Sequence, residues 1–415
     1  MLYKSTGASI PTQLDIVVAA SNSAQADKDV ALYVCDGTND EVTIQTAVNA
    51  ARGRVILAEG DYYIDAFPNA EGYGVSSAVH FGASAQQNIS VIGAGTGSCR
   101  KNGTTNGITG GAVIHVSSSC YTGLSGSTQY AIFASVSNGS SRKYPWTKVT
   151  IENVSFVIPD NQKKIICIDG WMMSSLSIKN VLAMAVADAS SASTLKAPVD
   201  GCIGIRGMQG SNFGMYNRWE SSFVWGFYEG YAVSGEHLVG IDLGSRYCNY
   251  GFTFNRKTNG TGAWLHPITL INCCDECNFN MPLFGNNGES GKSDGLSGRQ
   301  TINLIDFNLE WLSSYYAKGG AYATEANPGF TFGEISYTVQ TSYGGNSKNS
   351  VSTKFWATGS GANVKTVNKA HQIAGPTSER NTYTPTYMQE FYDTTLGKKL
   401  IYDGSAWKDM AGNSV

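Results

Sequence analysis

The clearest pattern in the chain is a succession of short apolar runs separated by polar turns. From residue 88 onward, alternating or continuous apolar residues are interrupted by Gly and Asn. These runs occupy residues 88–97, 149–158, 176–185, 237–244, 267–281 and 301–311. Asn153 and Asn180 lie 27 residues apart in matching Ile-x-Asn-Val contexts, and Gly226, Gly251 and Phe279 step by 25 and 28. A repeat of roughly 20–50 residues indicates a solenoid, a propeller or another array.

The spacing of the runs discriminates between these architectures. After residue 53 almost no segment keeps the 3.6-residue period of a helical array. A propeller would show four strands in about 40–45 residues, with its own signatures, which are absent. Coils of two or three short strands in about 25 residues instead fit stacked rungs that share one core. The sequence therefore predicts an all-β fold, a right-handed parallel β-helix.

A short helix is predicted near residues 38–52, ahead of the first rung. Thr38 and Glu41 have the spacing of a capping box. Apolar residues then recur on one helical face, at Ile44, Ala47, Val48 and Ala51. Strands are predicted at residues 55–57 and 62–64. Such a helix would cover the end of the solenoid, where an unpaired strand edge would otherwise template aggregation.

The segment CDGTNDEVTIQTAVNAARGRVILAEGDYYI, residues 35–64, resembles the opening of the pectate-lyase-like β-helix superfamily. There an Asp-Gly-Thr-x-Asp segment begins the capping helix, and a Gly-x-Val-x-Leu-x-x-Gly-x-Tyr run starts the first rung. Glu59 replaces the Pro that is usual before the second Gly. We interpret Asp36, Asp40 and Glu41 as capping and turn residues rather than as catalytic acids.

The C-terminal segment MQEFYDTTLGKKLIYDGSAWKDMAG contains three predicted short strands around two turns. The strands are expected at Phe391 and Tyr392, at residues 400–402 and at Trp407. The run Tyr-Asp-Thr-Thr-Leu-Gly-Lys followed by Gly-Ser-Ala-Trp resembles the closing motif of many bacteriophage tail proteins. Its aromatic density suggests packing between subunits or against the β-helix.

Together the two resemblances identify the chain as similar to bacteriophage tailspikes and short tail fibres of the parallel β-helix superfamily. They imply a virion protein of the tail, assembled in the cytoplasm of the bacterial host. They also imply a homotrimer that contacts other tail or baseplate proteins and engages a bacterial surface polysaccharide.

Composition shifts suggest four regions. Residues 1–34 are an N-terminal segment for virion attachment or subunit contact, and residues 35–316 form the β-helix. Residues 317–380 are a Gly/Ser/Thr-rich β or connecting region, and residues 381–415 carry the C-terminal motif. The Gly-, Ser-, Thr- and Asn-rich stretch at 98–145 is interpreted as rung-corner loops.

Overall composition removes several classes of function. Gly is abundant at 48 residues while only 15% of residues are charged, a balance that fits many short strands and tight turns rather than disorder. The net charge of −3 gives no basic footprint for nucleic acid. No apolar stretch approaches the roughly 20 residues of a membrane span, and the first residues lack the apolar core of a signal peptide. Nine scattered cysteines argue against a disulfide framework, so a reducing compartment is expected.

The candidate chemistry lies in the last apolar runs. In IDFNLEW, alternation would send Ile305, Phe307 and Leu309 to one face and the polar residues to the other. Carboxylates on neighbouring rungs, about 4.8 Å apart, approach the roughly 5–5.5 Å of a retaining glycosidase pair. The candidate catalytic residues are Asp306, Glu310, Asp275 and Glu276. The candidate glycan-binding residues are Trp311, Trp264, Trp219 and Asn308, with Trp225 as a further sugar platform.

Each of these residues also has a plain structural interpretation. Outward carboxylates are ordinary solvated surface, and aromatic rings stack inside β-helices or between subunits. The Cys-Cys-Asp-Glu-Cys run at 273–277 lacks the paired spacing of a zinc site, so no metal or cofactor is expected. Two hypotheses therefore stay open: an enzyme that degrades host polysaccharide by hydrolysis or elimination, and a non-enzymatic adhesin or structural spike.

Overall fold

A computed structural model of the chain describes the greater part of its residues. The described residues are 15–71, 73–82, 88–102, 105–135, 148–185, 198–208, 217–254, 265–276, 278, 283–284, 300–310, 330–340, 364–366, 373–381 and 390–415. Statements about the structure refer to these residues. None of the helices among them has the length and apolarity that a membrane span requires.

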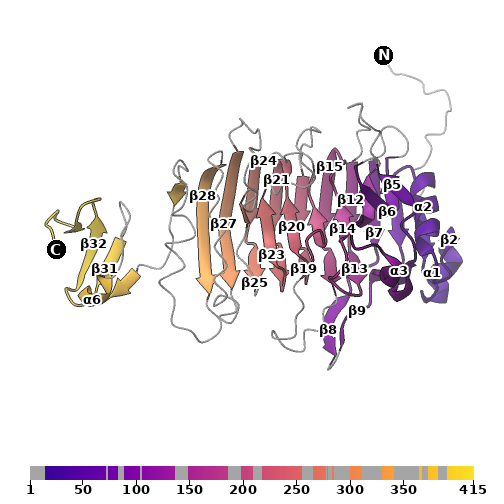
Figure 1. The fold of residues 1–415 in the computed structure, drawn as a ribbon, viewed down its shortest axis with the longest axis horizontal. Coiled ribbons are helices and arrows are strands. Elements are labelled where there is room, and N and C mark those ends of the chain that lie inside the picture. The colour runs from indigo at the N-terminus through magenta and orange to yellow at the C-terminus, as the bar shows by residue number, and fades with distance from the viewer. Residues whose placement is uncertain are drawn as a thin grey trace, which may run out of the picture.

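The structure confirms the predicted parallel β-helix. Strands stack along the long axis of the molecule, from the helices at the N-terminal end to β28 (Phe330–Gln340) (Figure 1). Successive rungs pair in parallel throughout, for example Val149 with Leu176 and Ile178 with Trp219. A 19-stranded sheet and an 8-stranded sheet enclose the core between them.

A complete rung contains three strands. The first strands are β3 (Arg54–Leu57), β7 (Asn88–Gly93), β12 (Lys148–Glu152), β15 (Ser175–Lys179), β18 (Asn217–Glu220), β21 (Gly235–Ile241) and β24 (Leu265–Ile271). The second strands are β4 (Gly60–Ile64), β10 (Ala112–Val116), β13 (Val154–Ile158), β16 (Leu182–Ala185), β19 (Phe223–Trp225), β22 (Gly244–Arg246) and β25 (Cys274–Glu276). The third strands are β6 (Val75–Phe81), β11 (Gln129–Ser135), β14 (Ile165–Asp169), β17 (Ile203–Arg206), β20 (Glu229–Val233), β23 (Tyr250–Phe254) and β26 (Leu283–Phe284).

The large sheet extends beyond the boundaries expected from composition. At the N-terminal end β1 (Ile16–Ala19) pairs with β3 and with β2 (Tyr33–Val34), so residues before 35 already belong to it. At the other end β27 (Gln300–Glu310) pairs with both β24 and β25, and β28 and β29 (Val364–Thr366) follow.

The predicted capping helix is present as α2 (Asp40–Ala50), beside the shorter α1 (Gln25–Val30). Its apolar face is buried as expected, with Ile44, Ala47 and Val48 fully inaccessible. The predicted capping box is wrong. The N-cap is Asn39 in the left-handed region (φ 49°), and the Thr38 hydroxyl donates to Asp36 instead.

The acidic residues of the first helical turn attach α2 to the first rung. The Asp40 carboxylate accepts from the Tyr63 amide (2.8 Å), and the Glu41 carboxylate accepts from the Asp65 amide (3.0 Å). Both side chains are buried, and that burial raises the pKa of each. These carboxylates therefore satisfy backbone donors where helix and strand meet.

A line of left-handed residues marks the corner between the first and second strands. It comprises Asn153, Asn180, Ser221, Asp242, Asn272 and Asp306, with φ between 46° and 56°. Asn180 donates to Asn153 (2.8 Å), and Asn272 donates to Asp242 (2.6 Å). Asn and Asp tolerate this conformation because their short polar side chains bond locally. The matching contexts of Asn153 and Asn180 in the sequence are thus one corner repeated in successive rungs.

Aromatic side chains fill the core between the sheets. Phe81, Phe133 and Phe156 contact one another edge to face, with centroids 5.5 and 5.3 Å apart. Further along, Tyr231 stacks on Phe252 at 4.9 Å. Such contacts add to the hydrophobic stabilisation that burial of the rings provides.

The stretch at 98–145 is not made of corner loops alone, as its composition suggested. A hairpin of β8 (Ser98–Asn102) and β9 (Thr105–Thr109) projects from the corner, but β10 and β11 are strands of the second rung. The short helix α3 (Ser118–Gly123) lies between them. The apolar runs of β10 and β11 were not recognised as strands, because the residues around them are polar.

The predicted three strands of the C-terminal motif are present as β31 (Glu390–Asp393), β32 (Lys398–Tyr402) and β33 (Trp407–Asp409). They form a small sheet with β30 (Ile373–Gly375), drawn in yellow in Figure 1. Phe391, Leu400 and Trp407 pack on one another in its core. Its aromatic residues therefore serve this small sheet's own interior, with Tyr392 partly exposed.

Candidate functional site

The second strands of the rungs place one column of residues on the outer face of the β-helix. In successive rungs Met184 pairs with Trp225, Trp225 with Arg246, and Arg246 with Glu276. The column continues at backbone level from Glu276 to Glu310. Equivalent positions in adjacent rungs are about 4.8 Å apart, so this column brings unlike side chains close together.

Strand alternation explains why these side chains face outward. In each short strand the middle residue is fully buried: Val224 in β19, Ser245 in β22 and Asp275 in β25. The residues on either side therefore point away from the core. Trp225 and Arg246 are accordingly only half-buried.

Trp225, Arg246, Tyr247 and Glu276, which we call the Trp225 cluster, contact one another. The Arg246 guanidinium lies 5.4 Å from the Trp225 ring centroid and 5.0 Å from that of Tyr247. The two rings meet edge to face at 4.9 Å. Arg246 Nη1 is 3.2 Å from Glu276 Oε1. The guanidinium is thus fixed by two aromatic rings and one carboxylate.

The Trp225 cluster has the chemistry that sugar recognition needs. The apolar C–H faces of a pyranose stack on aromatic rings, while its hydroxyl groups bond to carboxylate and guanidinium groups. Phe223 extends the aromatic surface, with its centroid 6.4 Å from that of Trp225. Upstream the same face is apolar, with Val157, Leu182 and Met184 buried there.

The structure separates the four candidate catalytic residues. Glu276 is half-buried in the Trp225 cluster, and Glu310 is its register partner in β27. Asp306 is exposed at the corner, where its positive φ of 50° places it in the line of left-handed residues. That corner also breaks the expected alternation. Leu304 and Phe307 are the buried residues there, whereas Ile305 is only half-buried.

The expectation that Asp275 faces outward is wrong, because its side chain is fully buried in the core. It accepts hydrogen bonds from Ser245 Oγ (3.0 Å) and Asn278 Nδ2 (2.6 Å). Burial raises the pKa of Asp275 to about 7. Gly251 makes room for this polar group, since a Cβ there would lie 1.8 Å from Asp275 Oδ1.

The candidate sugar platforms are also separated. Trp219 is 1% exposed and lies tilted against Tyr231 in the core, with ring centroids 6.2 Å apart, so its expected surface position is wrong. Trp264 and Trp311 lie outside the described residues. Asn308 is in β27, where its backbone pairs with Cys274.

Sequence reasoning missed Arg246 and Tyr247. Arg246 stands in a short strand with no distinctive motif, and Tyr247 takes up a left-handed turn conformation (φ 55°) that usually signals Gly or Asn. The repeat length contained a signal for Arg246. It lies 30 residues before Glu276, which is about the length of one rung. Aligning the two rungs would have placed them side by side.

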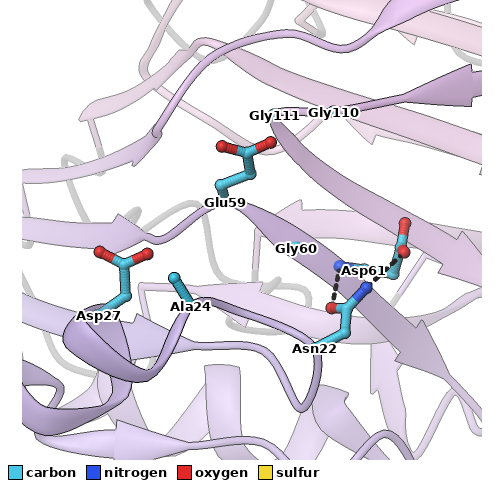
Figure 2. A pocket seen from close by; sticks show the side chains of 8 residues that line it. All are labelled: Asn22, Ala24, Asp27, Glu59, Gly60, Asp61, Gly110 and Gly111. Atoms are coloured by element: carbon cyan, nitrogen blue, oxygen red, sulfur yellow. Dashed lines mark hydrogen bonds between the residues drawn. The ribbon is translucent and has the colours of Figure 1, made fainter.

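A separate hollow lies near the capping helices (Figure 2). It is a cavity of about 370 Å³ lined by Asn22, Ala24, Asp27, Glu59, Gly60, Asp61, Gly110 and Gly111. Asp61 is held by Asn22 Nδ2 (2.7 Å) and lies 2.8 Å from His115 Nε2. The hollow is acidic, and none of the described residues that line it is aromatic. It therefore offers charge but no stacking surface for a sugar ring.

No group of three or more His, Cys, Asp or Glu residues in the described part of the chain is arranged to hold a metal ion. Among the cysteines whose side chains the structure describes, the free thiols are Cys35, Cys120, Cys167, Cys202, Cys248, Cys273 and Cys274. Cys273 is buried, as the alternation of the CCDEC run predicted for at least one of its cysteines.

The fold and the outer column define a parallel β-helix protein with an aromatic and charged cluster on its surface. No protein-family model and no curated protein matches the sequence. Among solved structures, the chain is similar to tailspike protein 3 of bacteriophage CBA120, at 12% identity over 90% of this chain and 67% of that one. The TM-score is 0.21, and a superposition this loose carries no argument about the site.

Proposed function

We propose that the chain is a bacteriophage tail protein, a tailspike or short tail fibre, that binds a bacterial surface polysaccharide through the Trp225 cluster. The observation that carries this proposal is the outer column itself, where two aromatic rings, a guanidinium and a carboxylate converge on a rigid β-helix. The resemblance of the C-terminal motif to the closing motif of phage tail proteins supports the virion role, and the resemblance of residues 35–64 to the pectate-lyase-like superfamily supports the β-helix that carries the cluster.

The rigidity of the three strands that carry the Trp225 cluster favours binding. Val224, Ser245 and Asp275 anchor the three strands in the core, so the outward side chains start from fixed backbone positions. Pre-organisation lowers the entropy that association loses. A polysaccharide ligand, which is flexible in solution, benefits from such a surface.

The test is binding of purified protein to a panel of capsular polysaccharides and lipopolysaccharides from Gram-negative bacteria, followed by sizing of the products. We expect at least one to bind, and Trp225→Ala to weaken that binding by up to about ten-fold, since stacking contributes up to about 1.5 kcal/mol. The matched control is Tyr392→Ala, which removes an exposed aromatic ring from the C-terminal sheet. Unchanged binding by Trp225→Ala would contradict the proposal.

A second candidate is a non-enzymatic adhesin or structural spike with the same β-helix. The burial of Asp275 favours it, since this candidate carboxylate lies in the core and does not face a ligand on the outer surface. Product sizing decides between the two. Shortened polysaccharide indicates a depolymerase, whereas binding without shortening indicates the adhesin.

We also propose that the chain assembles as a homotrimer together with other tail or baseplate proteins. The support is an apolar column on the outer face of the first strands. Ile241 pairs with Ile271, and Ile271 with Ile305, and all three are only half-buried. A contiguous column of half-buried apolar side chains is consistent with an interaction surface.

A further inference from the structure

We propose that Asp275 is a positioning residue for the Trp225 cluster, and that its protonation switches the cluster from a weakly binding to a tightly binding state. This inference rests on the polysaccharide binding proposed above and adds a pH dependence to it. It is carried by three polar side chains in the core, Asp275, Ser245 and Asn278, which we call the inner polar group. Each of them is buried, with 4% exposure or less.

The inner polar group and the Trp225 cluster lie back to back on the same strands. On β22 Ser245 faces the core, and Arg246 beside it faces outward. On β25 Asp275 faces the core, and Glu276 beside it faces outward. Neighbouring side chains of a strand point to opposite faces of the sheet. A shift of either strand that rearranges the inner polar group therefore moves the outer side chains as well.

Asn278 connects the inner polar group to the turn that carries Tyr247. Its Nδ2 donates to Asp275 Oδ1 (2.6 Å), and its Oδ1 accepts from the Cys248 amide (2.7 Å). Tyr247 comes directly before Cys248 and has a positive φ of 55°. A residue with a large side chain keeps this conformation when the surrounding contacts hold it there. The hydrogen bonds of Asn278 thus link the carboxyl group in the core to the Tyr247 ring in the cluster.

The surroundings of Asp275 suit an uncharged carboxyl group. Its Oδ1 accepts from Asn278 Nδ2 and from Ser245 Oγ (3.0 Å), whereas its Oδ2 has no hydrogen-bond partner among the described residues. Burying an ionised carboxylate costs far more than burying the neutral acid. Burial accordingly raises the pKa of Asp275 to about 7.

The elements around β25 place their other titratable groups away from the Asp275 carboxyl group or keep them neutral. On β22 the Arg246 guanidinium belongs to the outer cluster. On β23 Tyr250 is half-buried, and the backbone partner of Asp275 on β27 is the apolar Leu309. Cys248 is the core thiol that the charge of Asp275 affects, and burial raises its pKa to about 12. We therefore assign a transition near neutral pH to Asp275.

The direction of the switch follows from these contacts. Below pH 7 the neutral acid leaves the inner polar group intact, and the outer side chains keep their positions. As pH rises through about 7, the carboxyl group becomes a buried anion. It gains stability by moving toward water, and this movement displaces β25 and the turn held by Asn278. The Trp225 cluster should therefore bind tightly at pH 6 and weakly at pH 8, and bound ligand should in turn raise the pH at which Asp275 ionises.

The first experiment needs no ligand and uses the full chain. Tryptophan fluorescence is recorded from about pH 5.5 to about pH 8.5, because movement of Arg246 and Tyr247 changes the surroundings of the Trp225 ring. We expect a transition near pH 7 that is lost in Asp275→Asn and in Trp225→Phe. Ser245→Ala should move the transition to higher pH, since the hydrogen bond from this hydroxyl lowers the pKa of Asp275.

The second experiment measures the affinity for whichever polysaccharide of the panel binds, at pH 6 and at pH 8. Wild type should bind up to about ten-fold more weakly at pH 8, the limit for one group that must be protonated. Asp275→Asn should bind with similar affinity at both pH values. Asp242→Asn, at an exposed corner, is the matched control and should behave as wild type in both experiments. Circular dichroism confirms that each variant is folded at both pH values.

A wild type without the fluorescence transition, or an Asp275→Asn variant that keeps it, would overturn the inference. So would equal affinity of the wild type at both pH values, which leaves the proposed binding function standing. If Asp275→Asn does not fold, the direction of the shift in Ser245→Ala decides. If no polysaccharide of the panel binds, the proposed function fails, and the fluorescence experiment still decides whether Asp275 positions the Trp225 cluster.

Discussion

At the residue scale, the buried Asp275 is the clearest case of a side chain whose setting changes its chemistry. Burial raises its pKa from 3.8 to about 7, against hydrogen bonds from Ser245 and Asn278 that lower it. The folded protein therefore binds this proton more tightly than the unfolded chain. The resulting stabilisation is fully present below about pH 4 and is lost as pH rises through about 7.

Replacing Asp275 by Asn should remove that dependence. Near pH 8 we expect Asp275→Asn to unfold at a higher temperature than wild type, by an amount corresponding to about 1–3 kcal/mol. The difference should shrink as pH falls to 5. Thermal unfolding followed by circular dichroism at several pH values measures it. Asp306→Asn, at an exposed corner, is the control, and an equal effect of both substitutions would contradict the assignment.

Residue-level predictions from sequence succeeded where the pattern is local. The contexts of Asn153 and Asn180 repeat because the same left-handed corner recurs, and the structure stacks these residues. The spacing of 25 residues between Gly226 and Gly251 suggested equivalent positions in successive rungs, and this prediction is wrong. Gly226 lies beside Tyr247, and Gly251 lies beside Gly230. Loops of differing length between rungs shift the phase, and sequence spacing alone does not record the shift.

At the element scale, a buried ion pair ties neighbouring third strands together. Arg206 on β17 donates to both oxygens of Asp169 on β14, at 2.7 and 2.5 Å. Tyr73 donates to the same carboxylate (3.0 Å), and the Trp171 ring lies 5.2 Å from the guanidinium. The pair is 3% and 0% exposed, so its partners are strongly interdependent.

Breaking this pair should destabilise the β-helix strongly. Arg206→Met leaves the Asp169 carboxylate buried without its cation, which costs about 3–5 kcal/mol. Chemical unfolding measures the change. The control is Arg218→Met, whose exposed pair with Glu220 contributes about 0–1 kcal/mol. Equal effects of the two substitutions would contradict the structural role of the buried pair.

The outer column was only partly predictable at this scale. Glu276 and Glu310 were candidates because they occur in apolar runs that alternate, and Trp225 was named as a platform. Trp219 and Asp275 were misplaced because alternation alone does not state which phase faces inward. That phase depends on the corner residues, such as Ser221 and Asn272, which reset the alternation in each rung.

At the scale of the whole molecule, the β-helix was predictable because repeats, cap and turns all indicate the same architecture.

The assembly of the chain into a trimer was implied only by resemblance. We expect light scattering at physiological salt to give three times the 44.3 kDa of one chain. Ile271→Glu should weaken the assembly, because it places a charge in the apolar column of the first strands. A clean monomer of the wild type at micromolar concentration would contradict the proposed trimer.

The most direct test of the proposed function is a crystal structure of the chain with a bound oligosaccharide from the polysaccharide that it recognises. We expect a sugar ring stacked on Trp225 or Tyr247, with hydroxyl groups bonded to Arg246 or Glu276. Sugar bound in the acidic hollow near Glu59 and Asp61, with the Trp225 cluster empty, would contradict it.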